Sequence, residues 1–279
     1  EWTDKAAQAV GSEYTNISAG GTVSGPLILN KTFYNISYQL GRQSRDNQTL
    51  RGTSALGFQT AGVSEDSVAR FLNILTTNNV PGVGGPLHPD RLSDNGSFLG
   101  RINIQPPSST SGQSLGFTFN GGWNRQSPAF GGVTQLPSAS GDRSGYNGGL
   151  QAQHSGYFKM VLSETNAGIT VSNNTGDPYL SMPAGRVRVT SDLASGSGVQ
   201  NLTFGGNQIL SSSSRSLGGS FQNTLSWFDD ANKHRVKLGT ELQYSTATSN
   251  PANNLLGTVS YNSLADLENA IPASFSRTL

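Results

Sequence analysis

Two stretches near the C-terminus, joined by the polar turn 229–232, alternate between apolar and polar residues. The apolar positions are Leu217, Gly219, Phe221, Leu225 and Trp227 in the first stretch, and Val236, Leu238, Leu242 and Tyr244 in the second. Successive side chains of a strand point to opposite faces, so this period of two predicts an antiparallel strand pair with one apolar and one polar face. The strands, at roughly fourteen residues, are long for a soluble sheet and suit tilted strands that cross a bilayer.

The same pattern predicts three earlier strand pairs, and therefore about eight long strands in all. Their ranges are 15–29 with 32–42, 97–106 with 112–124, and 144–154 with 158–171. Short connections at 30–31, 107–111, 155–156 and 229–232 alternate with long ones at 43–96, 125–143, 172–214 and after 247. Transmembrane barrels sort their connections in this way, with tight turns at one rim and large loops at the other.

The long connections carry elements of their own. Ser64 is a helix N-cap candidate, because Val68, Phe71, Leu72 and Leu75 follow at helical spacing. Ser263 begins a second short helix, 264–270, and residues 186–189 with 201–204 form a candidate hairpin. The predicted fold is all-β: an antiparallel transmembrane β-barrel segment whose long loops carry short helices. A secreted, soluble β-sandwich or adhesin-like binding protein, with its apolar faces turned inward, is the alternative.

Composition changes this picture little. Charged residues make up 13% of the 279 residues, the formal net charge is +1, and there is no cysteine. The small net charge argues against a general nucleic-acid binder, and the missing cysteines exclude a disulfide framework and a thiolate metal site. Disorder is not favoured, because aromatic residues persist at alternating positions. The sequence has no apolar run long enough for a membrane-spanning helix and no opening signal peptide, and neither absence excludes a barrel.

Several segments resemble TonB-dependent outer-membrane receptors, specifically their Oar-like branch. The segments are 24–28 (SGPLI) with 31–34 (KTFY), 179–189, 223–227 (NTLSW), 234–239 (HRVKLG), 262–267 (NSLADL) and 272–275 (PASF). Each segment is short, but their order and spacing extend the resemblance over most of the chain.

The resemblance implies a plugged barrel of about 22 strands that imports a scarce nutrient with energy from the inner membrane. The implied partners are outer-membrane lipid, the protein's own plug domain, a TonB-type energy-coupling protein and an unidentified nutrient, peptide or glycan, with no nucleic acid and no cofactor. The sequence shows no recognisable plug, coupling segment or aromatic-ended final strand. We therefore expect residues 1–279 to be one partial barrel domain of a larger transporter in the bacterial outer membrane.

Two sets of residues are candidate functional positions in such a barrel. Lys233, Arg235, Lys237 and Glu241, together with Arg101, are expected to face the lumen. They either form a solvated inner wall or dock the plug domain. Trp123, Trp227 and Tyr244 suit the aromatic girdles at the lipid interfaces, and ordinary core packing is the alternative.

No catalytic chemistry is expected. Residues 112–116 match the G-x-S-x-G pattern of serine hydrolases, with Ser114 as the nucleophile and His154 or His234 as a base. That motif requires a turn from strand to helix, whereas an alternating strand follows here. His88, His154 and His234 lack metal-ligand spacing, so no metal site is predicted.

Overall fold

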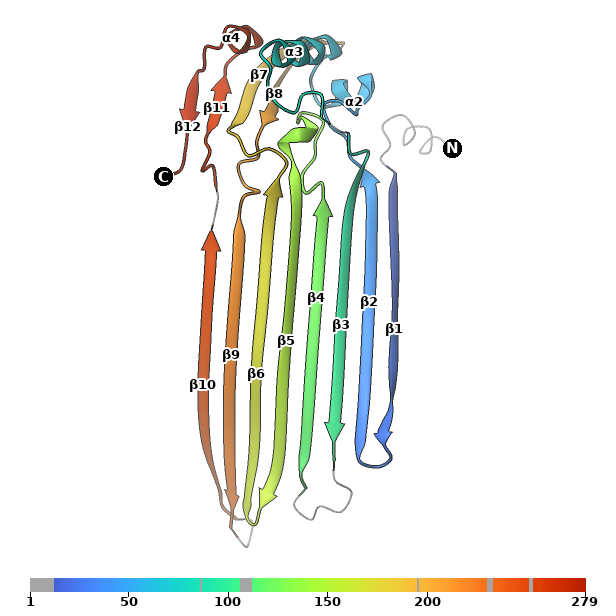
Figure 1. The fold of residues 1–279 in the computed structure, drawn as a ribbon, viewed down its shortest axis with the longest axis vertical. Coiled ribbons are helices and arrows are strands. Elements are labelled where there is room, and N and C mark those ends of the chain that lie inside the picture. Colours follow the sequence, from blue (N-terminus) through green and yellow to red (C-terminus); the bar gives the residue numbers. More distant parts are fainter. Residues whose placement is uncertain (1–12, 86, 106–111, 195, 230–232, 251–252) are drawn as a thin grey trace.

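Eight long strands form one antiparallel sheet in the computed structural model, which describes residues 13–279 apart from 86, 106–111, 195, 230–232 and 251–252 (Figure 1). Each strand pairs with the next long strand in the chain, in the order β1-β2-β3-β4-β5-β6-β9-β10. Within the described residues, the outer edges of β1 and β10 have no partner strand, so the sheet is open. The strands are β1 (Tyr14–Ile28), β2 (Thr32–Asp46), β3 (Asp90–Ile104), β4 (Ser114–Ser127), β5 (Gly141–Phe158), β6 (Val161–Pro178), β9 (Ser213–Phe228) and β10 (Arg235–Asn250).

This arrangement confirms the predicted all-β class, the eight long strands and the alternation of short and long connections. One turn was predicted in the wrong place. β5 does not end at 155–156 but continues to Phe158, because Ser155 and Gly156 pair with Glu164 and Ser163 of β6. The chain turns at Lys159, whose φ is 57°. The predicted turns at 107–111 and 229–232 lie largely outside the described residues.

Both ends of the sheet slant in the same direction (Figure 1). Thr32, at the short-turn end of β2, is in register across the sheet with Asn223, yet β9 runs five residues further, to Phe228. At the opposite end Arg42 is in register with Ser213, where β9 begins, while β2 continues four residues further, to Asp46. Strands of similar length with staggered ends are tilted relative to the rims, as barrel strands must be.

One face of the sheet is apolar and open. We call it the apolar face; it carries Phe119, Leu150 and Ile169 in one row of paired positions, and Phe117 and Phe221 in the next row. In the described part of the chain no second sheet covers it, and Leu238 on β10 keeps 63% of its surface exposed. A soluble sandwich needs such a cover, because a large exposed apolar surface marks contact with a protein partner or a membrane. The sandwich alternative is therefore not supported.

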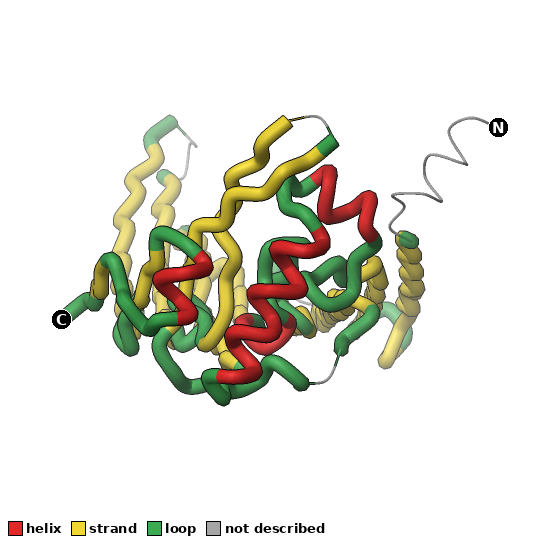
Figure 2. The backbone as a smooth tube through the Cα atoms, turned by 90° about the horizontal axis from the view of Figure 1, so that it is seen from above, coloured by secondary structure: helices red, strands yellow, loops and turns green. Residues whose placement is uncertain are grey.

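The long connections fold together into one unit at the rim opposite the short turns (Figures 1 and 2). We call it the loop cap; it comprises the described residues of 47–89, 128–140, 179–212 and 253–279. Its sheet has the order β12-β11-β7-β8. Its elements are α2 (Ala55–Thr60), α3 (Glu65–Thr77), the 3-10 turn η1 (Pro137–Ala139), β7 (Ala184–Leu193), β8 (Gly196–Gly205), β11 (Thr258–Tyr261), α4 (Leu264–Glu268) and β12 (Ser274–Ser276).

A single hydrophobic core joins the four connections. Leu50 and Phe71 come from the first, Leu136 from the second, Val187 from the third and Leu267 from the last. Phe71, at the centre of α3, is fully buried and meets the ring of Phe204 edge-on at 5.7 Å. Four separate loops thereby become one folded layer over one rim of the sheet.

Helices α3 and α4 of the loop cap begin where the sequence predicts, whereas α2 was not predicted. Ser64 caps α3, and its Oγ accepts a hydrogen bond of 3.3 Å from the Ser67 amide. Ser263 caps α4 in the same way, through the Asp266 amide. An N-cap side chain satisfies one of the free amides of the first turn, which fixes where each helix starts. No helix among the described residues is long and apolar enough to cross a membrane.

Candidate functional site

The face opposite the apolar one carries mainly polar and small residues on the eight strands, with a few large apolar ones such as Leu99 and Leu162, and we call it the polar wall. On β5 it carries Asn147, Gly149, Gln151 and Gln153, which alternate with Leu150 and Ala152 of the apolar face. Each pairs with another small or polar residue, as in Asn120 with Gly149 and Gln151 with Gly168. The sheet therefore separates an apolar environment on one side from a polar one on the other.

Four of the five predicted lumenal charges project from the polar wall, in its half nearer the short turns. Arg101 pairs with Asn35 and Thr118, and its Nε donates to Asn103 Oδ1 at 3.1 Å. Arg235, Lys237 and Glu241 follow one another along β10. Lys233 lies outside the wall, in the connection before β10, where its backbone amide donates to Asp229 Oδ1 at 2.7 Å. These four charged residues thus lie on the predicted face of the sheet, and Lys233 does not. Their function stays a prediction.

Arg235 and Lys237 differ in their surroundings. The Arg235 guanidinium donates to Ser226 Oγ at 3.1 Å and lies over the Phe228 ring, 4.9 Å from its centroid. It is therefore held by its own hairpin. Lys237 makes no ion pair within the described residues and is exposed to the space in front of the wall. Lys237 is the better placed of the two to meet another polypeptide.

All three predicted interface aromatics lie on the apolar face. Trp123 pairs with Tyr146 near the loop-cap end, and Trp227 pairs with Val161 and Val236 near the short turns. These positions at opposite ends fit two aromatic girdles. Tyr244 lies between them, beside Gly219. Whether any of the three contacts a lipid interface stays a prediction.

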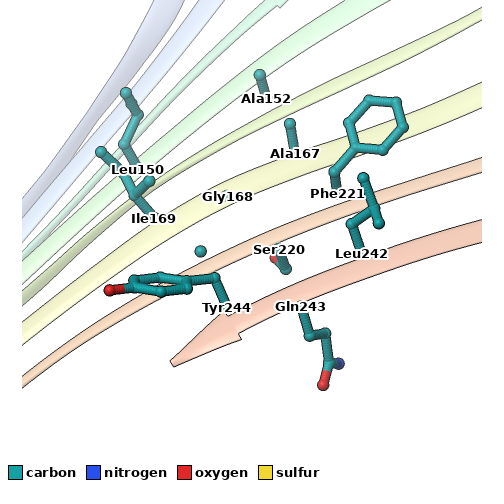
Figure 3. Close-up of a pocket in the computed structure, with 11 residues that line it drawn as sticks. Leu150, Ala152, Ala167, Gly168, Ile169, Ser220, Phe221, Leu242, Gln243 and Tyr244 are labelled. Carbon is teal, nitrogen blue, oxygen red and sulfur yellow. The ribbon is translucent and has the colours of Figure 1, made fainter. Parts of the chain in front are cut away.

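A hollow of about 650 Å³ opens on the apolar face next to Tyr244 (Figure 3). Its floor consists of small residues, Ala152, Ala167 and Gly219, with Ile169 and Phe221 rising around them. The side chains that enclose it are mainly aliphatic and aromatic, so the hollow offers little to a polar substrate. The polar wall is therefore the surface of the sheet that suits polar ligands.

A belt of hydrogen-bonded charges closes the apolar face toward the loop cap. Arg42 donates two hydrogen bonds to Asp94, of 2.6 and 2.9 Å, and Arg125 lies 3.4 Å from Asp142. Arg42, Asp94 and Arg125 are cross-strand neighbours, one step beyond Trp123. Charges on a lipid-facing surface are costly at mid-depth and inexpensive at the interface, so the belt marks a boundary of the apolar zone.

Tyr179 ties this belt to the loop cap. Its phenol donates to Asp142 Oδ1 at 2.9 Å, and its ring stacks on His88 at 5.2 Å. Burial raises the pKa of Tyr179 to about 12, and the negative charge of Asp142 acts in the same direction. The phenol therefore stays protonated and keeps donating at any physiological pH.

The residues of the hydrolase motif are not brought together. Ser114 lies on the polar wall, where its Oγ is 2.8 Å from Ser155 Oγ. His154 pairs with Leu115 on the opposite, apolar face, so its imidazole cannot serve Ser114 as a base. Within the described residues no three His, Cys, Asp or Glu side chains cluster as metal ligands.

No protein-family model matches the sequence, and no curated protein matches it either. The fold resembles the crystal structure of the outer membrane transporter YddB from Escherichia coli, with a TM-score of 0.51 and 14% identity. This likeness covers 94% of the present chain and 30% of the YddB chain. The siderophore receptor PiuA from Acinetobacter baumannii matches with a TM-score of 0.30 and 9% identity, over 85% of this chain and 40% of that one, which is too low to indicate a shared fold.

The likeness to YddB concerns the fold alone, and the chain spans less than a third of that transporter's length. It agrees with the open sheet, the staggered strand ends and the sorting of short turns and long loops to opposite rims. The described chain has the architecture of a partial, antiparallel outer-membrane β-barrel.

Proposed function

We propose that this chain is part of the barrel of a TonB-dependent, Oar-like transporter in the bacterial outer membrane. The observation that carries the proposal is the two-sided sheet, whose open apolar face ends at a belt of charges and whose opposite face is mainly polar. In a barrel the apolar face contacts lipid and the polar wall lines the lumen. The chain contributes to substrate capture and energy-coupled import and catalyses no covalent reaction.

The two rims have different roles in this proposal. Transmembrane barrels place short turns on the periplasmic side and long loops outside the cell. The loop cap therefore faces the exterior, where it helps to capture substrate, and the charged end of the polar wall faces the periplasm. An open sheet leaves unpaired backbone groups at β1 and β10, which lipid cannot satisfy. Further strands of the full-length protein close the barrel.

Membrane fractionation of cells that produce the full-length protein tests the proposal. We expect the protein in the outer-membrane fraction, resistant to extraction by carbonate or urea and released only by detergent. The reason is the exposed apolar face, which requires hydrocarbon or detergent as its solvent. A full-length protein that is soluble and monomeric without detergent would contradict the transporter proposal.

The charges at the periplasmic end of the polar wall are proposed to dock the plug domain. Their support is the position of Arg235 and Lys237 on the wall, with Lys237 lacking an ion-pair partner in the described residues. Reversing both, as Arg235→Glu with Lys237→Glu, is expected to lower substrate uptake and protease protection of the plug about tenfold, the effect of losing roughly 1.4 kcal/mol.

Lys159→Glu is the matched control, because Lys159 lies in the turn between β5 and β6, at the same rim but outside the polar wall. It should leave uptake and plug protection unchanged. If the double reversal also changes neither, the charged row is only a solvated inner wall.

A further inference from the structure

A band of the polar wall, which runs from the centre of β1 to the loop-cap end of β10, has no ionisable side chain. Three neighbouring rows cross all eight strands with small, amide or hydroxyl residues, apart from Leu99. We call these rows the neutral band. They are Ser18-Gly41-Asn95-Asn124-Gly145-Asn174-Ser214-Ser249, Gly20-Gln39-Ser97-Gly122-Asn147-Ser172-Ser216-Ala247 and Thr22-Ser37-Leu99-Asn120-Gly149-Thr170-Gly218-Ser245.

Charged residues of the wall lie on either side of this band. Arg143 lies toward the loop cap, and Arg101, Glu164 and Glu241 lie toward the short turns. The three rows themselves thus carry no charge, although charged residues of the same face flank them. A ligand that lies along the band meets only neutral groups.

Several amides of the neutral band are free to bind. Among the described residues, the side chains of Asn120, Asn124 and Asn147 make no hydrogen bond to the protein. Each amide carries two N–H donors and a carbonyl acceptor. A row of such groups suits a ligand that both donates and accepts hydrogen bonds at many points along its length.

A hollow of about 380 Å³ lies on the wall over β4, β5, β6, β9 and β10. Asn120, Gln151, Thr170 and Gln243 line it, and Gly149 and Gly218 form part of its floor. A Cβ atom at Gly218 would lie 2.7 Å from Thr170 Oγ1, so a larger residue there would displace the polar lining. The glycines thereby keep open a recess that no charged side chain lines.

We propose that the neutral band binds an uncharged, polyhydroxylated ligand, namely a neutral oligosaccharide; this rests on the transporter function proposed above. Each sugar hydroxyl is both donor and acceptor, and it can exchange its water hydrogen bonds for bonds to the free amides and hydroxyls. An anionic or cationic ligand would lose hydration in front of the band and find no opposite charge. Peptides fit less well, because Leu99 is the only large apolar side chain among these rows.

Binding of the detergent-solubilised full-length protein to an oligosaccharide array tests the proposal. The array carries neutral glucans, xylans, mannans and galactans beside uronate-containing and glucosamine-containing chains of equal length. We expect binding to one or more neutral oligosaccharides and none to the charged ones. The double variant Asn120→Leu with Gln151→Met changes one residue of the band and one of the adjacent row, which line the same recess. It keeps side-chain size but removes both amides, and is expected to weaken this binding about tenfold or more.

The control is Asn16→Leu with Gln43→Met, the same two exchanges at a cross-strand pair of the polar wall that lies outside both the neutral band and the recess. It should bind as the unaltered protein does. Selective binding of charged oligosaccharides, binding of no oligosaccharide, or equal binding by the two double variants would overturn the proposed ligand class. A protein that still fractionates with the outer membrane would in those cases retain the proposed transporter function.

Discussion

Leu150→Arg is expected to prevent stable folding of the full-length protein into lipid vesicles, whereas Gln151→Arg is expected to be tolerated. The two residues are neighbours on β5, and their side chains project from opposite faces of the sheet. Leu150 is 46% exposed on the apolar face. An arginine on the lipid-facing side of a barrel costs about 2–4 kcal/mol near the bilayer midplane. On the lumenal side the same charge remains in water.

Folding is measured by the heat-modifiable gel mobility of the protein in vesicles and by its unfolding in guanidinium chloride. We expect the unfolding free energy to fall by about 2–4 kcal/mol for Leu150→Arg and by less than about 1 kcal/mol for Gln151→Arg. Equal losses for both variants would show that lipid does not cover the apolar face. A larger loss for Gln151→Arg would show that the two faces have been assigned the wrong way round.

The alternation of side chains predicts the centre of each strand and not its ends. In β2 the apolar positions Tyr34, Ile36, Tyr38 and Leu40 carry the period of two. The strand nevertheless continues to Asp46 through a polar segment in which no hydrophobic alternation remains. Those residues are strand because β3 supplies their backbone partners, as in Arg45 with Arg91. Pairing between distant segments leaves no local signal, so the predicted long loops came out too long.

The loop cap shows the same division. Ser64 and the helical spacing of Val68, Phe71 and Leu75 predict α3, because capping and amphipathic spacing are local. The parallel pairing of β11 with β7 joins Thr258 to Ala184, and nothing in either short segment indicates it. Nor does the sequence predict that four connections share one core, because the contacts of that core join segments far apart in the chain.

The candidate site was predictable only in part, because local patterns show in the sequence and pairing between distant strands does not. Alternation within β10 places Arg235, Lys237 and Glu241 on one face, and the structure has them there. The neutral band cannot be recognised in any single strand, since it requires the register of all eight. Within one strand its asparagines and glycines do not differ from the other residues of a polar face. Only the pairing of the strands aligns them into rows.

Phe71→Ala is expected to loosen the loop cap as a unit while the long strands stay folded. The Phe71 side chain is fully buried, and residues from all four long connections belong to its core. Truncating a buried phenylalanine to alanine typically costs about 3–5 kcal/mol, through lost contacts and the cavity that remains. The main sheet has its own hydrogen-bond ladders, so this loss should stay within the loop cap.

Hydrogen exchange of the full-length protein in detergent resolves the two parts. Amides of α3, β7, β8 and β11 are expected to lose protection together in Phe71→Ala, and those of β4, β5 and β6 to keep it. Leu56→Ala serves as the control, because Leu56 belongs to the same first connection but is exposed. If only α3 lost protection, the four connections would not form one cooperative unit. If the long strands also lost protection, the sheet would depend on the loop cap for its stability. Capture of a ligand by the loop cap would then be coupled directly to the barrel wall.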